Sequence, residues 1–280
     1  MNDRVRKVLS ALLAATFFVC AALFIRQQMH ERQADAAYES AAQMAVSSQE
    51  TVPESEPPVQ TEAAQETQPE APQMEWTPEP IHDDETAAAL QQIDLDALRE
   101  ENPEVIGWIQ IPDTKINYPI MQTGDNTYYL KHDWNGKRNV LGSIFMEKEN
   151  NRDMTDFNTI IYGHNVQSGR MFAALHDYDE QAFWQAHPHV YVVTDLGVLR
   201  YEIFSTYNAP VESSAYRLSF RQEKTRVAYL EEAIANSLID TGIVPATTDR
   251  ILTLSTCTGT GYSARRVVLA RLKMVETPIK

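Results

Sequence analysis

The stretch Ile251-Leu252-Thr253-Leu254-Ser255-Thr256-Cys257, followed by Thr258-Gly259-Thr260-Gly261, decides how this sequence folds. Its apolar and β-branched residues predict a strand, and the glycines after Cys257 predict a loop. A cysteine at a strand end is held in a fixed direction, while the loop leaves room for a substrate. Cys257 is therefore a candidate nucleophile, and it needs a nearby base or cation to form its thiolate.

Seven further short runs have the same β-type composition, with turn residues between several of them, which predicts one all-β barrel or sandwich with helical insertions. They cover residues 107–111, 116–122, 143–146, 159–162, 190–194, 198–207 and 265–273. Helical spacing of apolar residues predicts short helices around residues 90–98, a helical patch at 171–184 and a clear helix at 222–239. The last of these lies directly before the strand that carries Cys257.

The chain has 280 residues and a formal net charge of −15, and its acidity is concentrated in one segment. Residues 33–98 contain 15 Asp plus Glu and no Lys or Arg, which leaves 24 acidic and 24 basic residues elsewhere. A nucleic-acid surface needs a basic patch, so this distribution predicts no nucleic-acid partner. Residues 26–82 are rich in Glu, Gln, Pro and Ala, and we expect a disordered acidic linker, because such a segment buries too little apolar area to offset its ordering entropy.

The N-terminus carries an uncharged apolar run over residues 8–25, preceded by Arg4, Arg6 and Lys7. A run of about 18 such residues is near the minimum for crossing a bilayer, and cations before it predict a cytoplasmic tail at residues 1–7. The sequence therefore predicts a single-pass signal anchor in the cell membrane and an extracellular catalytic domain over residues 83–280. A cleaved signal peptide is the alternative.

The chain has two cysteines, and only Cys257 lies beyond the predicted anchor. An exported thiol without an intrachain partner is either reactive or buried and inert, and the count alone leaves both open. Cys20 lies inside the apolar run, where a cysteine behaves as a small apolar residue.

A base and a cation can be proposed from the same strand-end pattern. His164 follows the apolar run 159–162 and Gly163, which places it at a strand end with a permissive neighbour. Arg265 and Arg266 open the last strand, and only one of them can face the site because strand side chains alternate. An arginine can bind an oxyanion or a substrate carbonyl. A solvated charge at the strand edge is the alternative.

Several motifs resemble the sortases. Thr253-Leu254-Ser255-Thr256-Cys257 resembles their T-L-x-T-C motif, and an Arg eight residues after the Cys is similar to their catalytic arginine, which favours Arg265. The stretch Ile161-Tyr162-Gly163-His164-Asn165 resembles the catalytic-histidine segment of class B sortases. Residues 107–112, 116–120, 128–130 and 142–145 are similar to that class as well, so the resemblance covers about residues 90–273.

The resemblance implies a mainly β fold, namely a sortase-type eight-stranded β-barrel with N-terminal helices and a helical insertion before the strand of the catalytic cysteine. It implies catalytic roles for His164, Cys257 and Arg265, with no cofactor. Ser255, Thr256 and Asn165 are expected to contact the substrate. No spacing of Cys and His residues indicates a metal site.

The resemblance also implies a cysteine transpeptidase that cleaves a C-terminal sorting signal of a secreted protein after Thr and forms a thioester. An amine of a peptidoglycan precursor or of a pilin would then resolve the thioester, and the sequence leaves open which. Two alternatives remain: a papain-like cell-wall cysteine hydrolase and a non-catalytic, membrane-tethered peptide-binding module. Papain-like enzymes place Cys before His, whereas here His164 precedes Cys257.

Overall fold

The computed structural model describes residues 3–47, 84–257 and 263–276, and its centre is a closed barrel of eight strands. The strands are β1 (Val105–Gln110), β2 (Asn117–Met121), β3 (Ile144–Met146), β4 (Asn158–Tyr162), β5 (His189–Thr194), β6 (Gly197–Pro210), β7 (Ile251–Cys257) and β8 (Ala264–Glu276). Around the barrel they follow the order β1-β2-β3-β4-β7-β8-β6-β5. The prediction of a mainly β, eight-stranded barrel is confirmed.

The barrel is filled by the apolar residues of the predicted runs. Trp108 and Ile109 of β1, Ile161 of β4, and Leu252 and Leu254 of β7 are buried in one continuous core. Two pairings, β2 with β3 and β4 with β7, are parallel, and the other six are antiparallel. The parallel pairs need long connections, and the loops and short helices in these connections build the surroundings of the site.

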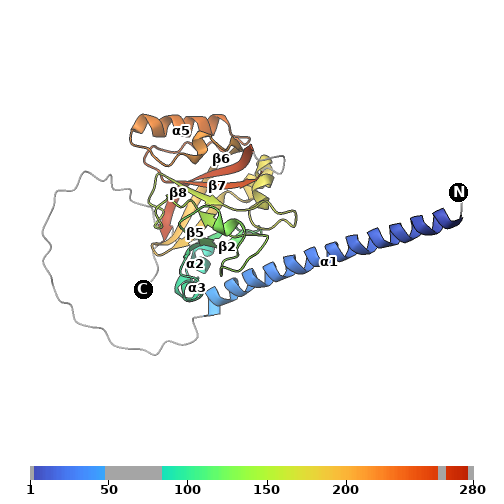
Figure 1. Cartoon of the computed structure of the whole chain (residues 1–280). Helices are drawn as coiled ribbons and strands as arrows, with labels where there is room; N and C mark the ends of the chain where they lie inside the picture. Colours follow the sequence, from blue (N-terminus) through green and yellow to red (C-terminus); the bar gives the residue numbers. More distant parts are fainter. Residues whose placement is uncertain (1–2, 48–83, 258–262, 277–280) are drawn as a thin grey trace, which may run out of the picture.

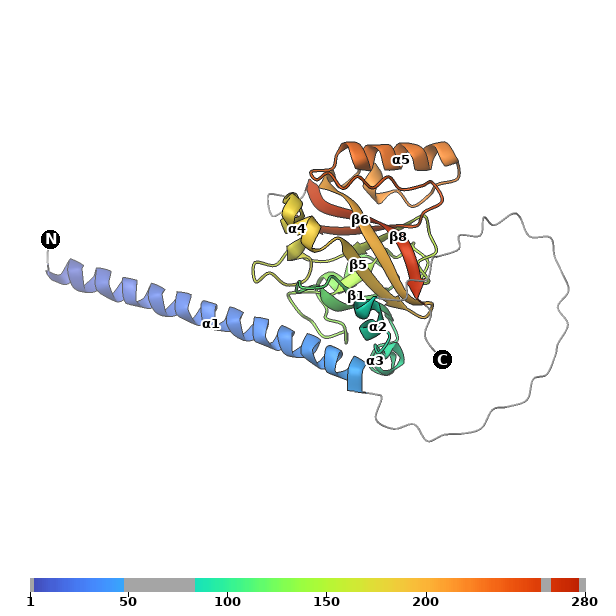
Figure 2. The same cartoon turned by 180° about the vertical axis from the view of Figure 1, so that it is seen from behind.

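Three of the described helices, α2 (Glu85–Leu90), α3 (Leu95–Glu101) and α5 (Glu223–Ala235), cover two opposite sides of the barrel (Figures 1 and 2). The other described helices are α1 (Asp3–Ser47) and α4 (Gln181–Ala186), with 3-10 turns η2 (Tyr128–Leu130), η3 (Ala173–Asp179) and η4 (Ser214–Tyr216). Figures 1 and 2 show α5 on one side, and α2 and α3 on the other. Helix α5 covers a second apolar cluster that includes Phe204, Tyr229 and Leu269. In the sequence, α5 lies between β6 and β7, where a helix was predicted before the strand of Cys257.

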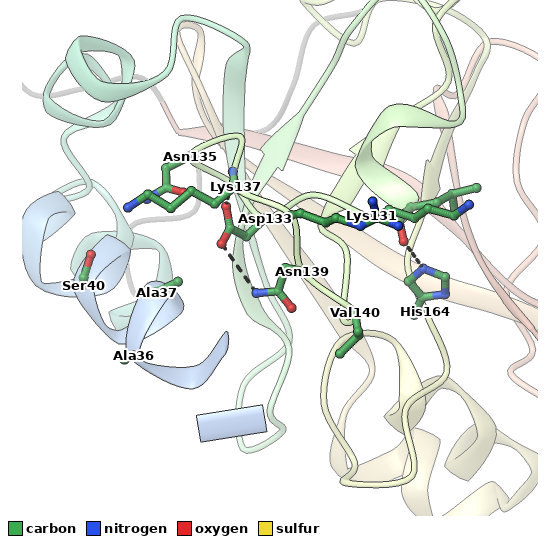
Figure 3. Close-up of a pocket in the computed structure, with 12 residues that line it drawn as sticks. Ala36, Ala37, Ser40, Lys131, Asp133, Asn135, Lys137, Asn139, Val140 and His164 are labelled. Carbon is green, nitrogen blue, oxygen red and sulfur yellow. Dashed lines mark hydrogen bonds between the residues drawn. The ribbon is translucent and has the colours of Figure 1, made fainter. Parts of the chain in front are cut away.

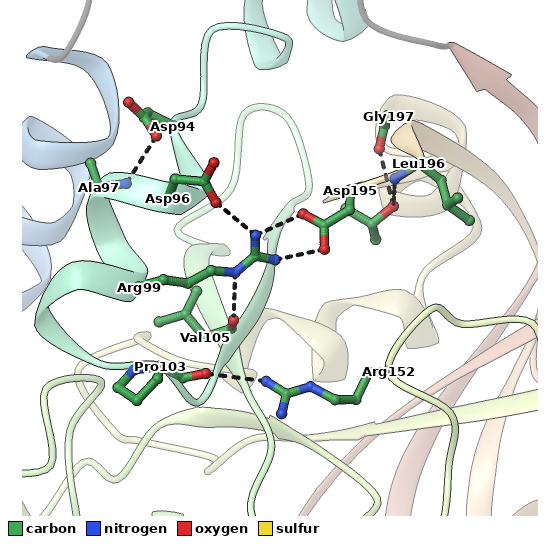
Figure 4. A network of polar contacts seen from close by, with 11 residues as sticks. Asp94, Asp96, Ala97, Arg99, Pro103, Val105, Arg152, Asp195, Leu196 and Gly197 are labelled. Atoms are coloured by element: carbon green, nitrogen blue, oxygen red, sulfur yellow. Dashed lines mark hydrogen bonds and ion pairs between the residues drawn. The ribbon is translucent and has the colours of Figure 1, made fainter. Parts of the chain in front are cut away.

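Helix α3 is tied to the barrel by one arginine (Figure 4). Arg99 donates two hydrogen bonds to the Asp195 carboxylate, of 2.7 and 3.0 Å, and a third of 3.1 Å to the Val105 carbonyl. Asp195 lies in the turn between β5 and β6, so one guanidinium connects α3, β1 and this hairpin. The fork of a guanidinium matches a carboxylate, which makes the contact directional as well as attractive.

The prediction that residues 26–82 form a disordered linker is wrong for residues 26–47, because α1 continues to Ser47. Tyr38, Ala41 and Ala45 form a stripe on this helix that is buried against the domain. The Trp134 indole donates a 2.8 Å hydrogen bond to the Ala37 carbonyl, and Asp94 N donates another of 2.8 Å to the Ala45 carbonyl. Alanine and glutamine favour helix, and this docking supplies the packing that an isolated polar helix lacks. The folded unit therefore begins before residue 83.

The remaining predictions for the N-terminal part of the chain, the anchor and the rest of the linker, have a different outcome. Residues 48–82 of the predicted linker lie outside the described part of the chain, as do the side chains of residues 3–15 in α1. Among the residues that the structure describes, no helix meets the length and hydropathy that a membrane crossing requires. The signal anchor at residues 8–25 stays a prediction from the sequence.

Candidate active site

The parallel pairing of β4 and β7 sets the first part of the site. Their register pairs Tyr162 with Ser255, and Gly163 N extends the ladder with a 3.1 Å hydrogen bond to the Ser255 carbonyl. Counting two residues onward on each strand gives His164 and Cys257. Because both strands run in the same direction, these two residues leave the barrel at the same edge.

The antiparallel pairing of β7 and β8 sets the second part. Cys257 is opposite Arg265, and Thr256 is opposite Arg266. Strand β7 therefore ends between the segment that carries His164 on one side and Arg265 on the other. The structure describes the backbone of Cys257 but not its side chain, so this backbone register is what places the cysteine.

A pocket of about 230 Å³ lies at this edge of the barrel. Its walls are formed by Asn126, Leu130, Phe145, Tyr162, Gly163, His164, Ser255, Thr256 and Arg265. The structure thus brings together four of the residues selected from the sequence: His164, Ser255, Thr256 and Arg265. Asn165 is not among them: it is exposed and lines a different pocket, with its amide 3.1 Å from the His176 imidazole.

The orientation of His164 is fixed by a backbone carbonyl. Its Nε2 lies 2.8 Å from the Leu130 oxygen, and a carbonyl only accepts, so Nε2 carries the proton in the neutral ring. Nδ1 is then the nitrogen that can accept or return a proton. This contact was missed from the sequence, because a backbone oxygen leaves no mark in residue identity.

Two glycines let the backbone approach the imidazole. Gly142 has a φ of +59°, and a Cβ there would lie 2.5 Å from the Tyr129 oxygen and 3.0 Å from His164 Cδ2. A Cβ on Gly163 would lie 2.5 Å from the Ile144 side chain and 2.7 Å from Phe172. Any side chain at either position would push the histidine segment out of place.

The two adjacent arginines have different surroundings. Arg265 lines the pocket, half-buried, beside His164. Arg266 is buried, with 3% of its side chain exposed, and is ion-paired with Asp179 of η3. Strand alternation therefore gives Arg265 to the pocket and Arg266 to the contact between β8 and η3.

A buried carboxylate stiffens the pocket wall. Glu147 accepts hydrogen bonds of 2.7 Å from the Asn126 amide and of 2.8 Å from the Tyr162 hydroxyl. Burial, and then the adjacent Glu147 carboxylate, raise the pKa of Tyr162 above its ordinary value. Tyr162 therefore stays a neutral hydroxyl at physiological pH. On the other wall, the Ser255 and Tyr216 hydroxyls lie 2.9 Å apart.

This arrangement is suited to acyl transfer. A cysteine at a strand end, an imidazole with one fixed nitrogen and a guanidinium supply a nucleophile, a proton carrier and an oxyanion partner. A papain-like site places its cysteine on a helix N-terminus, whereas Cys257 ends a strand. Among the described residues, no group of three or more His, Cys, Asp or Glu side chains has the arrangement of a metal site.

Comparison with known proteins agrees with this chemistry. The Sortase domain family matches residues 109–273. Sortase B of Listeria monocytogenes is 36% identical over 177 residues, which cover 63% of this chain and 72% of the relative. Sortase B of Staphylococcus aureus is 33% identical over 181 residues, covering 64% and 74%. A solved structure of the Staphylococcus aureus sortase B–substrate complex is similar with a TM-score of 0.62 and 31% identity, covering 67% of this chain and 87% of that one.

Proposed function

Since the chain belongs to the sortase family and is a cysteine transpeptidase of its class B, we propose that Cys257 is its nucleophile, His164 its proton carrier and Arg265 its oxyanion partner. The observation that supports this most is the strand register, in which the end of β7 lies between the His164 segment and Arg265. Ser255 and Thr256 line the pocket beside them and are proposed to contact the substrate peptide. We propose no substrate contact for Asn165, because it lines a different pocket.

In the first half-reaction, the Cys257 thiolate forms a C–S bond with the backbone carbonyl carbon of the Thr after which the C-terminal sorting signal is cleaved. The C–N bond of the scissile peptide then breaks. Protonated His164 gives a proton from Nδ1 to the leaving amine, and the product is a thioester. The Arg265 guanidinium stabilises the negative oxygen of the tetrahedral intermediate, where charge develops.

In the second half-reaction, an amine nitrogen attacks the thioester carbonyl. A C–N bond forms, the C–S bond breaks, and the proton of the amine passes to His164 while the thiolate leaves. We propose that the amine belongs to the cell wall, either to a peptidoglycan precursor or to a pilin. The acylated partners would be secreted proteins that carry a sorting signal.

Sortases act at the cell envelope, and we propose that residues 8–25 hold this one in the membrane with its N-terminus in the cytoplasm. The support is the uncharged apolar run after three cations. Alkaline carbonate extraction of membranes tests it: the full chain should stay in the pellet, and a chain that begins at residue 27 should be released. Release of both would refute the anchor.

The catalytic proposal is tested on Cys257→Ala and the unaltered enzyme with peptides that contain Pro and Thr before the cleavage site. Mass spectrometry should detect a thioester adduct on Cys257 only in the unaltered enzyme. With an added amine, the ligated product should replace the hydrolysed one. Full turnover by Cys257→Ala would exclude the cysteine mechanism. Hydrolysis that no amine can divert would instead indicate a cell-wall hydrolase.

A further inference from the structure

A second and larger cavity of about 930 Å³ lies next to the pocket described above. One side of it is the surface of α1, with Ala36, Ala37 and Ser40, and the other side is the loop over residues 130–140 (Figure 3). Its volume lies within the range of sites that bind small ligands. The small side chains of α1 keep this space open.

This cavity shares a wall with the proposed active site. Leu130 and His164 line both the cavity and the smaller pocket. The Leu130 carbonyl holds His164 by its Nε2, so the two spaces meet at the imidazole. A group bound in the cavity would lie beside the proton carrier and next to the pocket that Ser255 and Arg265 line.

The charge of the cavity is positive, although the chain as a whole is acidic. Lys131, Lys137 and Arg138 contribute to its lining and are exposed to solvent. Among the described residues that line the cavity, Asp133 is the one carboxylate. It is buried and accepts hydrogen bonds from the Lys137 backbone N at 2.8 Å and from the Asn139 amide at 3.5 Å. The three cations are therefore the charges that a ligand would meet.

The walls of the cavity are held together by contacts between α1 and the loop. Trp134 is fully buried and donates to the Ala37 carbonyl. The Tyr38 hydroxyl donates to the Gly142 carbonyl and lies 3.2 Å from the Ser143 hydroxyl. The cavity is thus a built feature of the fold, with one wall supplied by the part of α1 for which a disordered linker was predicted.

We infer that this cavity binds the acyl acceptor, a peptide that has a free amine and at least one carboxylate. The inference rests on the proposed function, because it assigns the second substrate of the same site. The carboxylate would lie among Lys131, Lys137 and Arg138, and the amine would lie against His164. The amine nitrogen then bonds to the thioester carbon, its proton goes to His164 Nδ1, and the C–S bond breaks to release the Cys257 thiolate.

Two acceptors that differ only in charge test the inference: triglycine, with a free carboxylate, and triglycinamide, without one. The test variant is Lys131→Gln/Lys137→Gln/Arg138→Gln. The control variant is Arg152→Gln/Arg221→Gln/Lys224→Gln, which removes three exposed cations that do not line this cavity. Thioester formation without acceptor is measured separately from the acceptor KM, so loss of the first half-reaction in the unaltered enzyme would refute the proposed function itself.

The unaltered enzyme and the control should have a KM about three- to tenfold lower for triglycine than for triglycinamide, as expected for a few exposed charge contacts. Raising the salt concentration should reduce this preference. The test variant should form its thioester at the normal rate and lose the preference. Equal KM values in the unaltered enzyme, or a preference retained by the test variant, would overturn the inference. So would slower thioester formation in the test variant alone, since it would assign the cations to the sorting peptide.

Discussion

Arg265 and Arg266 are adjacent in the sequence, yet the structure predicts that their removal will be detected by different measurements. Arg265→Met removes the guanidinium from the pocket that His164 and Ser255 line. Losing one donor to a developing oxyanion typically lowers the rate about 100- to 1,000-fold. Because Arg265 is only half-buried and the stem of Met is retained, we expect little change in melting temperature.

Arg266→Met acts on folding instead. It removes a guanidinium with 3% of its side chain exposed and leaves its partner Asp179, which is 46% exposed, to water. Breaking a fully buried pair costs about 3–5 kcal/mol, and since Asp179 can be resolvated, we expect about 2 kcal/mol here. For a domain of this size that lowers the melting temperature by about 4–8 °C, with an acylation rate within a few-fold of normal.

Single-turnover thioester formation, followed by quench and mass spectrometry, measures the first effect, and differential scanning fluorimetry measures the second. Arg265→Lys, which keeps the charge and loses the fork, serves as the matched control for geometry. A collapse of acylation in Arg266→Met with a normal melting temperature, together with normal acylation in Arg265→Met, would show that the assumed register of β8 is wrong by one residue.

Three further substitutions test the contacts around the barrel. Tyr38→Ala removes an aromatic ring buried against Tyr118 and should cost about 3 kcal/mol; it should also expose residues 30–47 to limited proteolysis, and unchanged cleavage would mean that α1 does not dock. Burial disfavours the charged form of Asp84 and acts to raise its pKa, but hydrogen bonds from Ala87 N, Tyr191 and Arg200 lower the pKa below the ordinary 3.8. Its carboxylate therefore stabilises the fold fully above about pH 4, and this stabilisation is lost as the pH falls further. In urea unfolding, Asp84→Asn should be less stable than the unaltered protein by about 1–2 kcal/mol at pH 7. Near pH 2 the two proteins should have the same stability. Glu147→Gln should slow thioester formation several-fold, because one of the two oxygens that accept from Asn126 and Tyr162 becomes an amide donor; an unchanged rate would make Glu147 a purely structural group.

The strands could be predicted from the sequence because each is a short β-branched run with turn residues around it. The site residues could be predicted for a related reason, because Cys257 and His164 both lie at the ends of such runs. What could not be predicted is their adjacency, because the parallel pairing of β4 with β7 depends on the closure of the whole barrel. The local pattern of either strand does not carry that information.

Residues 26–47 of helix α1 were missed for a different reason. Their buried stripe consists of Tyr38, Ala41 and Ala45, and two alanines barely raise the hydropathy of an acidic segment. Asn165 was expected to contact the substrate, but its amide lies 3.1 Å from the His176 imidazole and it lines a different pocket. The carbonyl of Leu130 that orients His164 has no side-chain signal at all.

With the proposed anchor at residues 8–25, the docking of α1 would also set the distance between the enzyme and the membrane. A linker over residues 26–82 would let the barrel range over about 190 Å when extended. In the structure, about 13 helical residues separate the end of the proposed span from Tyr38, which gives a rigid stand-off of about 20 Å. The enzyme would then select substrates by distance from the membrane. A secreted protein held in the same bilayer could be cut only if its sorting signal lay at the same distance from the membrane as the active site. The distance between a cleavage site and the apolar tail of its own protein would become part of the recognition, alongside the peptide sequence.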